Sequence, residues 1–486
     1  MGQESRAAVL LSIACILLVT AGWGQIGVPP PPEAPQPNYR SPQALPATTG
    51  PASFSGSVAS GNPTPGKLAL SLKDALEMAL RNNIGLLTGN QATRSAQGAK
   101  LRSLSDLLPN LNGRISQSEQ KINLAAFGIP PLPGTPAVVG PFSLSDARAY
   151  VSAPILDFQA INNHRAAAQD LKAAELSYAD AREFVVLVVA NLYLLAVSGS
   201  ARVDAAQAQL QTAQALYEQA IHQKNVGVVA AIDVLRAHVE LQNRHQRLLA
   251  SKNEFEKQKL DLSRAVGLPS GQEFNLADAM PYAPAPPVNL DQALQHAYQQ
   301  RRDVQRAQTM VNAAQAARRA AYSEALPSLK FNGDYGVIGR SFDSARSTFS
   351  ATAALRIPIF QGGKVRGDVR QADALLEQRK AELDNLRGQA DSDVRRAYLD
   401  LQSATEQVQV TREGLDLANQ TLTQARDRYA AGVADNIEVV QAQEALAAAN
   451  ETYISSIYAH NIAKVSLARA VGVAEKSVRE FLGANP

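Results

Sequence analysis

The chain has 486 residues, including 30 glycines, 26 prolines and a single cysteine, Cys15. Its formal net charge of +3 is too small to indicate a nucleic-acid partner, and we expect none. Because Cys15 lies in a segment that we expect to be removed, the mature chain should contain no disulfide framework, no cysteine-ligated metal and no cysteine nucleophile.

Residues 1–24 are typical of a secretory signal peptide. Arg6 precedes an apolar stretch, Ala7–Thr20, that is too short to span a bilayer as a helix. Small residues follow this stretch, and we expect cleavage just before Gln25. Lipidation of Cys15 is the alternative, and it is less favoured because apolar sequence surrounds the cysteine on both sides.

Residues 25–66 form a low-complexity arm that is rich in proline, glycine, serine and alanine. Such a segment buries too little apolar surface to offset the entropy lost on ordering, so we expect it to be disordered. A tether to peptidoglycan or to a partner protein is one interpretation of the arm. A passive spacer is the favoured interpretation.

The rest of the chain contains one pattern twice. Ser71–Leu76 recurs as Asn289–Leu294, and Leu108–Pro109 recurs as Leu326–Pro327 at the same offset. A repeat of this length indicates a duplicated half-molecule rather than the short unit of a solenoid. The expected parts are a first structural repeat at residues 67–268, a proline-rich connector at 269–288, a second repeat at 289–473 and a C-terminal tail at 474–486.

Each half is expected to begin with a helix. Ser71 and Asn289 are suitable N-caps, and each is followed three residues later by a side chain that can complete a capping box. Apolar residues then recur at helical spacing. We expect one continuous helix in each half, ending at Pro109 or Pro327, because proline interrupts helical hydrogen bonding.

Beyond these prolines the pattern changes to alternation, which is only weak from Leu111 to about Glu119, and it predicts β-hairpins at about residues 110–156 and 328–359. Each strand has about the 9–11 residues that a tilted transmembrane strand needs. In the last strand, alternation predicts that one set of side chains faces lipid while Thr352 faces the lumen. The residues of the lipid-facing set are Phe349, Ala351, Ala353 and Leu355.

A long helical hairpin is expected after each β-hairpin, at about residues 159–266 and 364–471. The two helices of each hairpin are joined at a glycine turn, at Gly227 in the first half and at Gly432 in the second. Helices of this length are expected to pack as coiled coils. The apolar stretch Phe184–Val197 is too short for a membrane span, so we expect it to be a buried part of its helix.

Two hairpins give four strands per chain, and four strands cannot close a barrel. An open sheet edge in lipid leaves unpaired backbone groups, at a cost of several kcal/mol each. The chain must therefore combine its strands with those of other copies. Two soluble β-hairpins at the end of a helical rod are the alternative, and the signal peptide makes it less favoured.

Several motifs, in order along the chain, carry a resemblance to a known family. They are Leu107–Pro109, Asn225–Val234, Ile357–Gly363 and Tyr429–Val433, the last followed by Ile437–Val439. With these motifs, nearly all of residues 67–475 resembles the TolC-like outer-membrane efflux proteins, also called outer membrane factors.

The resemblance implies a mostly α-helical fold with a transmembrane β-barrel contribution. Each chain would supply four strands to a 12-stranded barrel in a homotrimer, and its helices to a periplasmic α-helical tunnel. The implied function is a passive exit channel for small molecules, without enzyme activity or cofactors, served by a periplasmic adaptor protein and an inner-membrane pump. A duct for type I protein secretion and a soluble periplasmic coiled-coil scaffold are the alternatives.

In the family, the turns between the long helices form a periplasmic gate that is closed by polar contacts and acidic rings. The resemblance assigns this role to Asp233, Tyr429 and Glu438. Gln441 replaces a second acid, and Ala434 stands where an arginine often lies. We therefore expect hydrogen bonding by Tyr429, and packing of Val433 and Ile437, to hold the gate, while the acidic ring attracts cations.

The same gate residues also have structural interpretations. Asp233 and Glu438 lie near helix starts, where a negative charge complements the helix dipole. Tyr429 has the spacing of a coiled-coil packing residue. No zinc-protease, phosphate-binding or Ser-His-Asp motif occurs in the sequence, and no metal site is expected.

Overall fold

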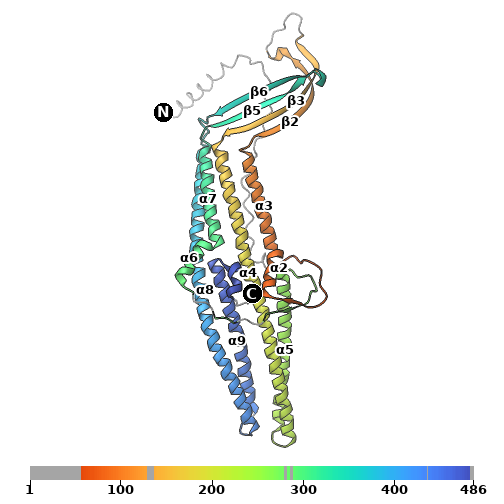
Figure 1. Cartoon of the computed structure of the whole chain (residues 1–486), viewed down its shortest axis with the longest axis vertical. Helices are drawn as coiled ribbons and strands as arrows, with labels where there is room; N and C mark the ends of the chain where they lie inside the picture. Colours follow the sequence, from red (N-terminus) through yellow and green to blue (C-terminus); the bar gives the residue numbers. More distant parts are fainter. Residues whose placement is uncertain (1–55, 128–135, 279–281, 285–287, 435, 482–486) are drawn as a thin grey trace, which may run out of the picture. The chain divides into compact units, whose positions relative to one another are not determined.

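The computed structural model describes residues 56–127, 136–278, 282–284, 288–434 and 436–481 (Figure 1). The chain divides into a sheet unit, built from Leu107–Asp157 and Pro327–Ile357, and a helical unit, which contains the other described residues. The expected signal peptide and most of the expected proline-rich arm lie outside the described residues.

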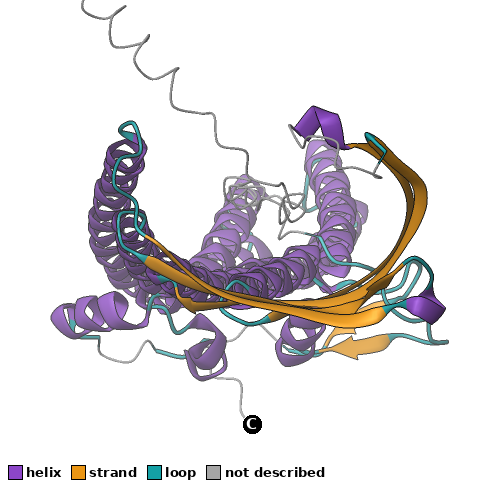
Figure 2. Cartoon of the chain, turned by 90° about the horizontal axis from the view of Figure 1, so that it is seen from above, coloured by secondary structure: helices purple, strands orange, loops and turns teal. Residues whose placement is uncertain are grey.

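The sheet unit is one antiparallel sheet to which both halves of the chain contribute. Its strand order is β2-β3-β5-β6, and β3 of the first half pairs with β5 of the second. The sheet is strongly curved (Figure 2). The hairpin connections contain short 3₁₀ helices, Leu124–Phe127 and Phe342–Ser344. The strands are β2 (Asn110–Asn123), β3 (Val138–Leu156), β5 (Ser328–Gly339) and β6 (Arg346–Arg356).

The helical unit contains matching elements from each half of the chain. The paired helices have 11 and 11, 22 and 22, 68 and 67, and 36 and 36 residues. The first half supplies α2 (Leu72–Asn82), α3 (Ile84–Ser105), α4 (Phe158–Asn225) and α5 (Ala231–Val266). The second half supplies α6 (Leu290–Gln300), α7 (Arg302–Ser323), α8 (Lys364–Ala430) and α9 (Asn436–Val471), followed by α10 (Ala474–Phe481).

The expectation of one continuous first helix in each half is wrong. The helix breaks between α2 and α3 at Asn83, and between α6 and α7 at Arg301, and both residues adopt extended backbone angles. Asn83 caps the new helix, because its side-chain oxygen accepts a hydrogen bond from the backbone N–H of Gly85 at 2.9 Å. No proline or glycine occupies either break, so local propensity did not reveal it.

Part of the expected disordered arm is in fact packed against the helical unit. Residues 56–66 form a strap along the end of α5: the backbone N–H of Ser57 donates to Arg264, and that of Ser60 donates to Gly267. The strap continues into β1 (Leu68–Leu70), which pairs in parallel with β4 (Phe274–Leu276). These residues are ordered by backbone hydrogen bonds to another segment of the chain. Amino-acid composition alone does not reveal such bonds.

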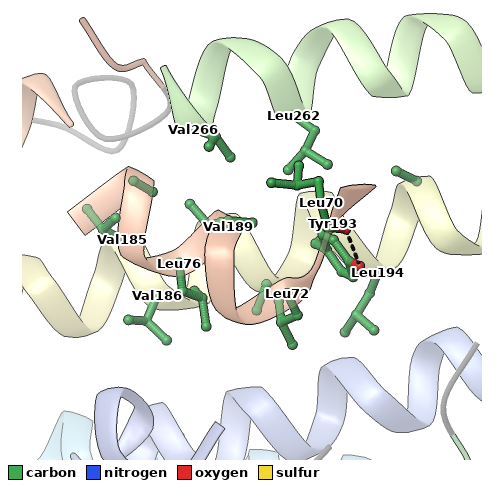
Figure 3. Close-up of a cluster of buried hydrophobic side chains, with 14 of the residues drawn as sticks. Leu70, Leu72, Leu76, Val185, Val186, Val189, Tyr193, Leu194, Leu262 and Val266 are labelled. Carbon is green, nitrogen blue, oxygen red and sulfur yellow. Dashed lines mark hydrogen bonds between the residues drawn. The ribbon is translucent and has the colours of Figure 1, made fainter. Parts of the chain in front are cut away.

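The largest apolar cluster packs β1 and α2 against the middle of α4 and the end of α5 (Figure 3). Tyr193 anchors this cluster: its hydroxyl donates to the Leu70 carbonyl at 3.0 Å and contacts Asp278 at 2.7 Å. In the described chain, only α4 contains an 18-residue stretch that is apolar enough to cross a membrane. Of that stretch, 56% is buried. The prediction that Phe184–Val197 is a buried helix is therefore confirmed.

Candidate functional site

The two glycine turns at the ends of the helical hairpins have the same geometry. Gly227 and Gly432 have φ values of 81° and 73°, a region that side chains with a Cβ rarely occupy. The N–H of Val228 donates to Gln223 at 2.9 Å, and the N–H of Val433 donates to Arg428 at 3.0 Å. This pattern satisfies the last carbonyls of α4 and α8 before the chain reverses.

The two turns are joined by a side chain that the sequence analysis did not select. Asn436, at the start of α9, is buried, and its Nδ2 donates to the backbone oxygen of Asp233 at 3.1 Å. The Asp233 carboxylate lies 3.2 Å from Nη1 of Arg236, one helical turn further along α5. Asn436 thus links the tips of the two hairpins within one protomer, a contact that no local sequence pattern encodes.

Glu438 also has a cationic partner. Its carboxylate lies 3.2 Å from Nε of Arg428, across the turn that joins α8 to α9. Asp233 and Glu438 thus each pair with an arginine of the same protomer, and the attraction of the acidic ring for cations stays a prediction.

Tyr429 is a packing residue in the protomer. Its side chain is 6% exposed and lies in a cluster with Leu422, Ala425, Val439 and Ala442. Its hydroxyl is buried without a hydrogen-bond partner among the described residues, so the expected hydrogen bond is not made within the protomer. Burial, and secondarily the charge of Asp233, raise the pKa of this hydroxyl.

The two apolar residues expected to close the tip are exposed in the protomer. Val433 is 69% exposed and Ile437 is 40% exposed. The buried cluster around Tyr429 includes Val439 in their place. Val439 lies two positions beyond Ile437, on the side of α9 that packs against α8. Packing of Val433 and Ile437 between protomers in the assembled gate stays a prediction.

The sheet has a different kind of site, made by the register of its strands. Residues paired across an antiparallel sheet lie on the same face. The register aligns Ile115 with Ala147 and Val337, so that apolar and small side chains of all four strands share one face. This apolar face consists of Leu111, Gly113, Ile115, Ala147, Ala149, Val151, Ala153, Leu329, Phe331, Gly333, Tyr335, Val337, Ser347, Phe349, Ala351, Ala353 and Leu355.

The opposite, polar face carries an ion-pair cluster that crosses three strands. Arg148 of β3 is ion-paired with Asp334 of β5, and its Nη2 donates to the Thr348 hydroxyl of β6 at 2.9 Å. Its Nε also lies 3.3 Å from Asp146. Gly336 lies under this arginine: a Cβ on Gly336 would be 2.7 Å from the Cα of Arg148. A glycine at this position therefore allows the close approach.

A seam of ion pairs joins the two helical hairpins above their tips. Arg244 of α5 is 2% exposed and lies 2.9 Å from the carboxylate of Glu444 on α9. Arg202 of α4 lies 2.8 Å from Glu451 of α9. The two partners of each pair lie about two hundred or more positions apart in the chain, so no local sequence pattern reveals them. Within the described ranges, no group of histidine, cysteine or acidic residues could hold a metal ion.

A model of the family described as outer membrane efflux protein matches residues 75–268 and 293–473. The chain belongs to this family. Its fold is that of a TolC-like channel, and the family is one of outer-membrane channels rather than enzymes. The protein is therefore an outer-membrane efflux protein, and the soluble scaffold is wrong as an alternative.

Individual relatives of this outer membrane efflux protein serve more than one kind of export. The chain is 25% identical to the pyoverdine export outer membrane protein OpmQ of Pseudomonas aeruginosa, with 85% of this chain and 87% of OpmQ covered. It is 23% identical to the alkaline protease secretion protein AprF of the same organism, with 70% and 73% covered.

Solved structures support the same fold. The outer membrane protein VceC of Vibrio cholerae superimposes with a TM-score of 0.69 at 21% identity, covering 82% of this chain and 96% of VceC. The Campylobacter jejuni CmeC outer membrane channel gives 0.69 at 18% identity, covering 89% and 93%. At these identities the likeness establishes the channel fold alone.

Proposed function

We propose that this protein is the outer-membrane exit duct of a tripartite efflux system, which passively conducts small molecules to the exterior. The observation that carries the proposal is the separation of the sheet into one apolar and one polar face. A curved sheet with this separation is suited to a barrel wall that has lipid outside and water inside.

The barrel requires more than one copy of the chain. In the described sheet, β2 and β6 are edge strands, each paired on one side only. Unpaired edges are not tolerated in lipid, so β6 of one copy would pair with β2 of the next. We propose a homotrimer with a 12-stranded barrel, built from protomers that are themselves two copies of one ancestral half. The helical units of the three copies would form the periplasmic tunnel.

The face assignment follows from the barrel. The apolar face would contact lipid, which places Phe349, Ala351, Ala353 and Leu355 outside. The polar face would line the lumen and would include Thr352, whose register partner on β5 is the polar residue Asn332. The alternation that predicted the set in β6 thus extends across the other three strands.

The glycine turns at Gly227 and Gly432 would form the periplasmic tip, with Asp233, Tyr429 and Glu438 at the gate. The contacts within the protomer favour a gate held by ion pairs and packing, because both carboxylates have arginine partners and the Tyr429 hydroxyl has none. A periplasmic adaptor protein and an inner-membrane pump are the proposed partners, since relatives are named as efflux pump components.

A duct for type I protein secretion is the second candidate. It is supported by the match to AprF, which is named as an alkaline protease secretion protein. Cross-linking in intact cells, followed by purification through this protein, separates the two candidates. A pump that exports small molecules among the captured partners favours efflux, and a transporter of the protein-secretion class favours secretion.

The duct itself is tested with purified full-length protein. We expect a species on unheated gels that migrates as a trimer and converts to the monomer on boiling, and stepwise conductance in planar bilayers. A monomer in detergent that inserts into bilayers without conducting would contradict the proposal.

A further inference from the structure

The charged side chains of the sheet are confined almost wholly to its polar face. From the row that pairs Ser328 with Arg356 to the row that contains Ser118, the apolar face carries no lysine, arginine, aspartate or glutamate. The polar face carries five cations and two carboxylates, a net charge of +3 per chain. These residues are Arg114, Arg148, Lys330, Arg346, Arg356, Asp146 and Asp334.

The two carboxylates are both engaged by one arginine. Asp146 and Asp334 pair with Arg148, whose side chain is only 14% exposed. The other four cations lie at exposed positions, and no ion pair involves any of them in the part of the chain that the structure describes. Arg114 lies on β2, Lys330 lies on β5, and Arg346 and Arg356 lie on β6.

We propose that the barrel interior is a basic lumen that favours anionic solutes, an inference that rests on the proposed duct. In the proposed barrel, the polar faces of three protomers surround one axis, so that the excess charge of each chain adds to the others. Low-dielectric walls around a water-filled channel focus such a field and raise the local concentration of oppositely charged solutes. The cargo class is therefore small organic or inorganic anions.

The tip does not impose the opposite preference. Asp233 and Glu438 are the carboxylates assigned to the gate, and each has an arginine within 3.2 Å. The four unpaired cations of the sheet have no such partners. Of these two regions, the basic lumen therefore carries the larger uncompensated charge.

The test is the reversal potential of the purified protein in planar bilayers under a potassium chloride gradient. We expect chloride to be more permeant than potassium. In the variant Arg114→Gln, Lys330→Gln, Arg346→Gln, Arg356→Gln, the charge of the polar face falls from +3 to −1 per chain, so the reversal potential should change sign. The matched control keeps every positive charge and carries the substitutions Arg114→Lys, Lys330→Arg, Arg346→Lys and Arg356→Lys. It should keep the wild-type selectivity.

A second measurement separates the barrel from the tip. Inositol hexakisphosphate, a small polyanion, is added to one side of the bilayer and then to the other. Block should be stronger from the barrel side and should weaken at least tenfold in the quadruple glutamine variant. A conducting channel that prefers potassium, or whose selectivity is the same in both variants, overturns the basic lumen and leaves the duct standing. A complete lack of conductance overturns both.

Discussion

The two halves of the chain break their first helix at equivalent positions but stabilise the break by different chemistry. In the first half, Asn83 caps the next helix, and the strap of residues 56–66 packs beside it. In the second half, the buried Arg301 binds Asp303 at 2.8 Å and Asp393 at 3.0 Å, and no strap is found among the described residues.

The packing against each break differs in the same way. Gly267 at the end of α5 contacts the strap, whereas Gly472 at the end of α9 contacts the backbone of Arg301 directly. Both glycines have positive φ, at 81° and 85°. The backbone conformation at these two glycines is therefore common to both halves, while the groups that pack against them differ. The two halves of this chain thus share one helical architecture although they differ in the packing around the break.

The largest expected effect comes from adding a Cβ to Gly267, at the end of α5. In Gly267→Ala the new atom would lie 2.8 Å from the Val58 carbonyl oxygen and 3.0 Å from the Cβ of Asn82. We expect a loss of about 3–5 kcal/mol of unfolding free energy, since the strap must move. Gly227→Ala is the matched control, because Gly227 has the same φ of 81° and nothing within 4 Å. It should cost only about 1–2 kcal/mol of backbone strain. Equal losses in thermal unfolding would show that the strap is not tightly packed.

The second comparison uses two lysines that occupy equivalent positions in the two halves. Lys259 on α5 lies 3.2 Å from Glu256 and near the rings of Phe255 and Phe274. Lys464 on α9 is fully buried and donates to the Ala283 carbonyl at 3.0 Å. Burial lowers the pKa of Lys464 to about 8.

This lowered pKa sets the direction of a pH dependence. Between pH 8 and the ordinary lysine pKa of 10.5, the folded state releases the proton and the unfolded state keeps it, so stability rises with pH. The rise is on the order of 3 kcal/mol and is absent below pH 8, where both states are protonated. Lys464→Met should abolish the rise, and Lys259→Met should retain it. A wild-type protein with flat stability from pH 8 to pH 10 would contradict this account.

The smallest expected effect is at the tip. Tyr429→Phe removes a buried hydroxyl that has no partner in the described chain, so stability should change by less than about 1 kcal/mol and single-channel conductance should stay the same. Tyr429→Ala removes the ring from its cluster and should cost about 3–5 kcal/mol. A clear increase in conductance for Tyr429→Phe would mean that the hydroxyl bonds across protomers in the assembled gate.

Sequence reasoning succeeded where the signal is local. Alternation predicted the set Phe349, Ala351, Ala353 and Leu355 that register then extends across the sheet, and glycines at 227 and 432 predicted the hairpin turns. It failed where distant segments decide the structure. The strap, the helix break at Arg301 and the burial of Lys464 each depend on partners that no window of neighbouring residues contains.

The central claim, that the apolar face of the sheet contacts lipid and the polar face lines a lumen, is tested by two neighbouring substitutions in β6. Ala353→Arg places a charge on the lipid side and should cost about 2–4 kcal/mol near the bilayer midplane. Thr352→Arg places the same charge in the lumen and should cost much less. The measurement is the yield of heat-modifiable trimer in outer membranes. The account predicts a strong loss for Ala353→Arg and near wild-type yield for Thr352→Arg, and equal yields would contradict it.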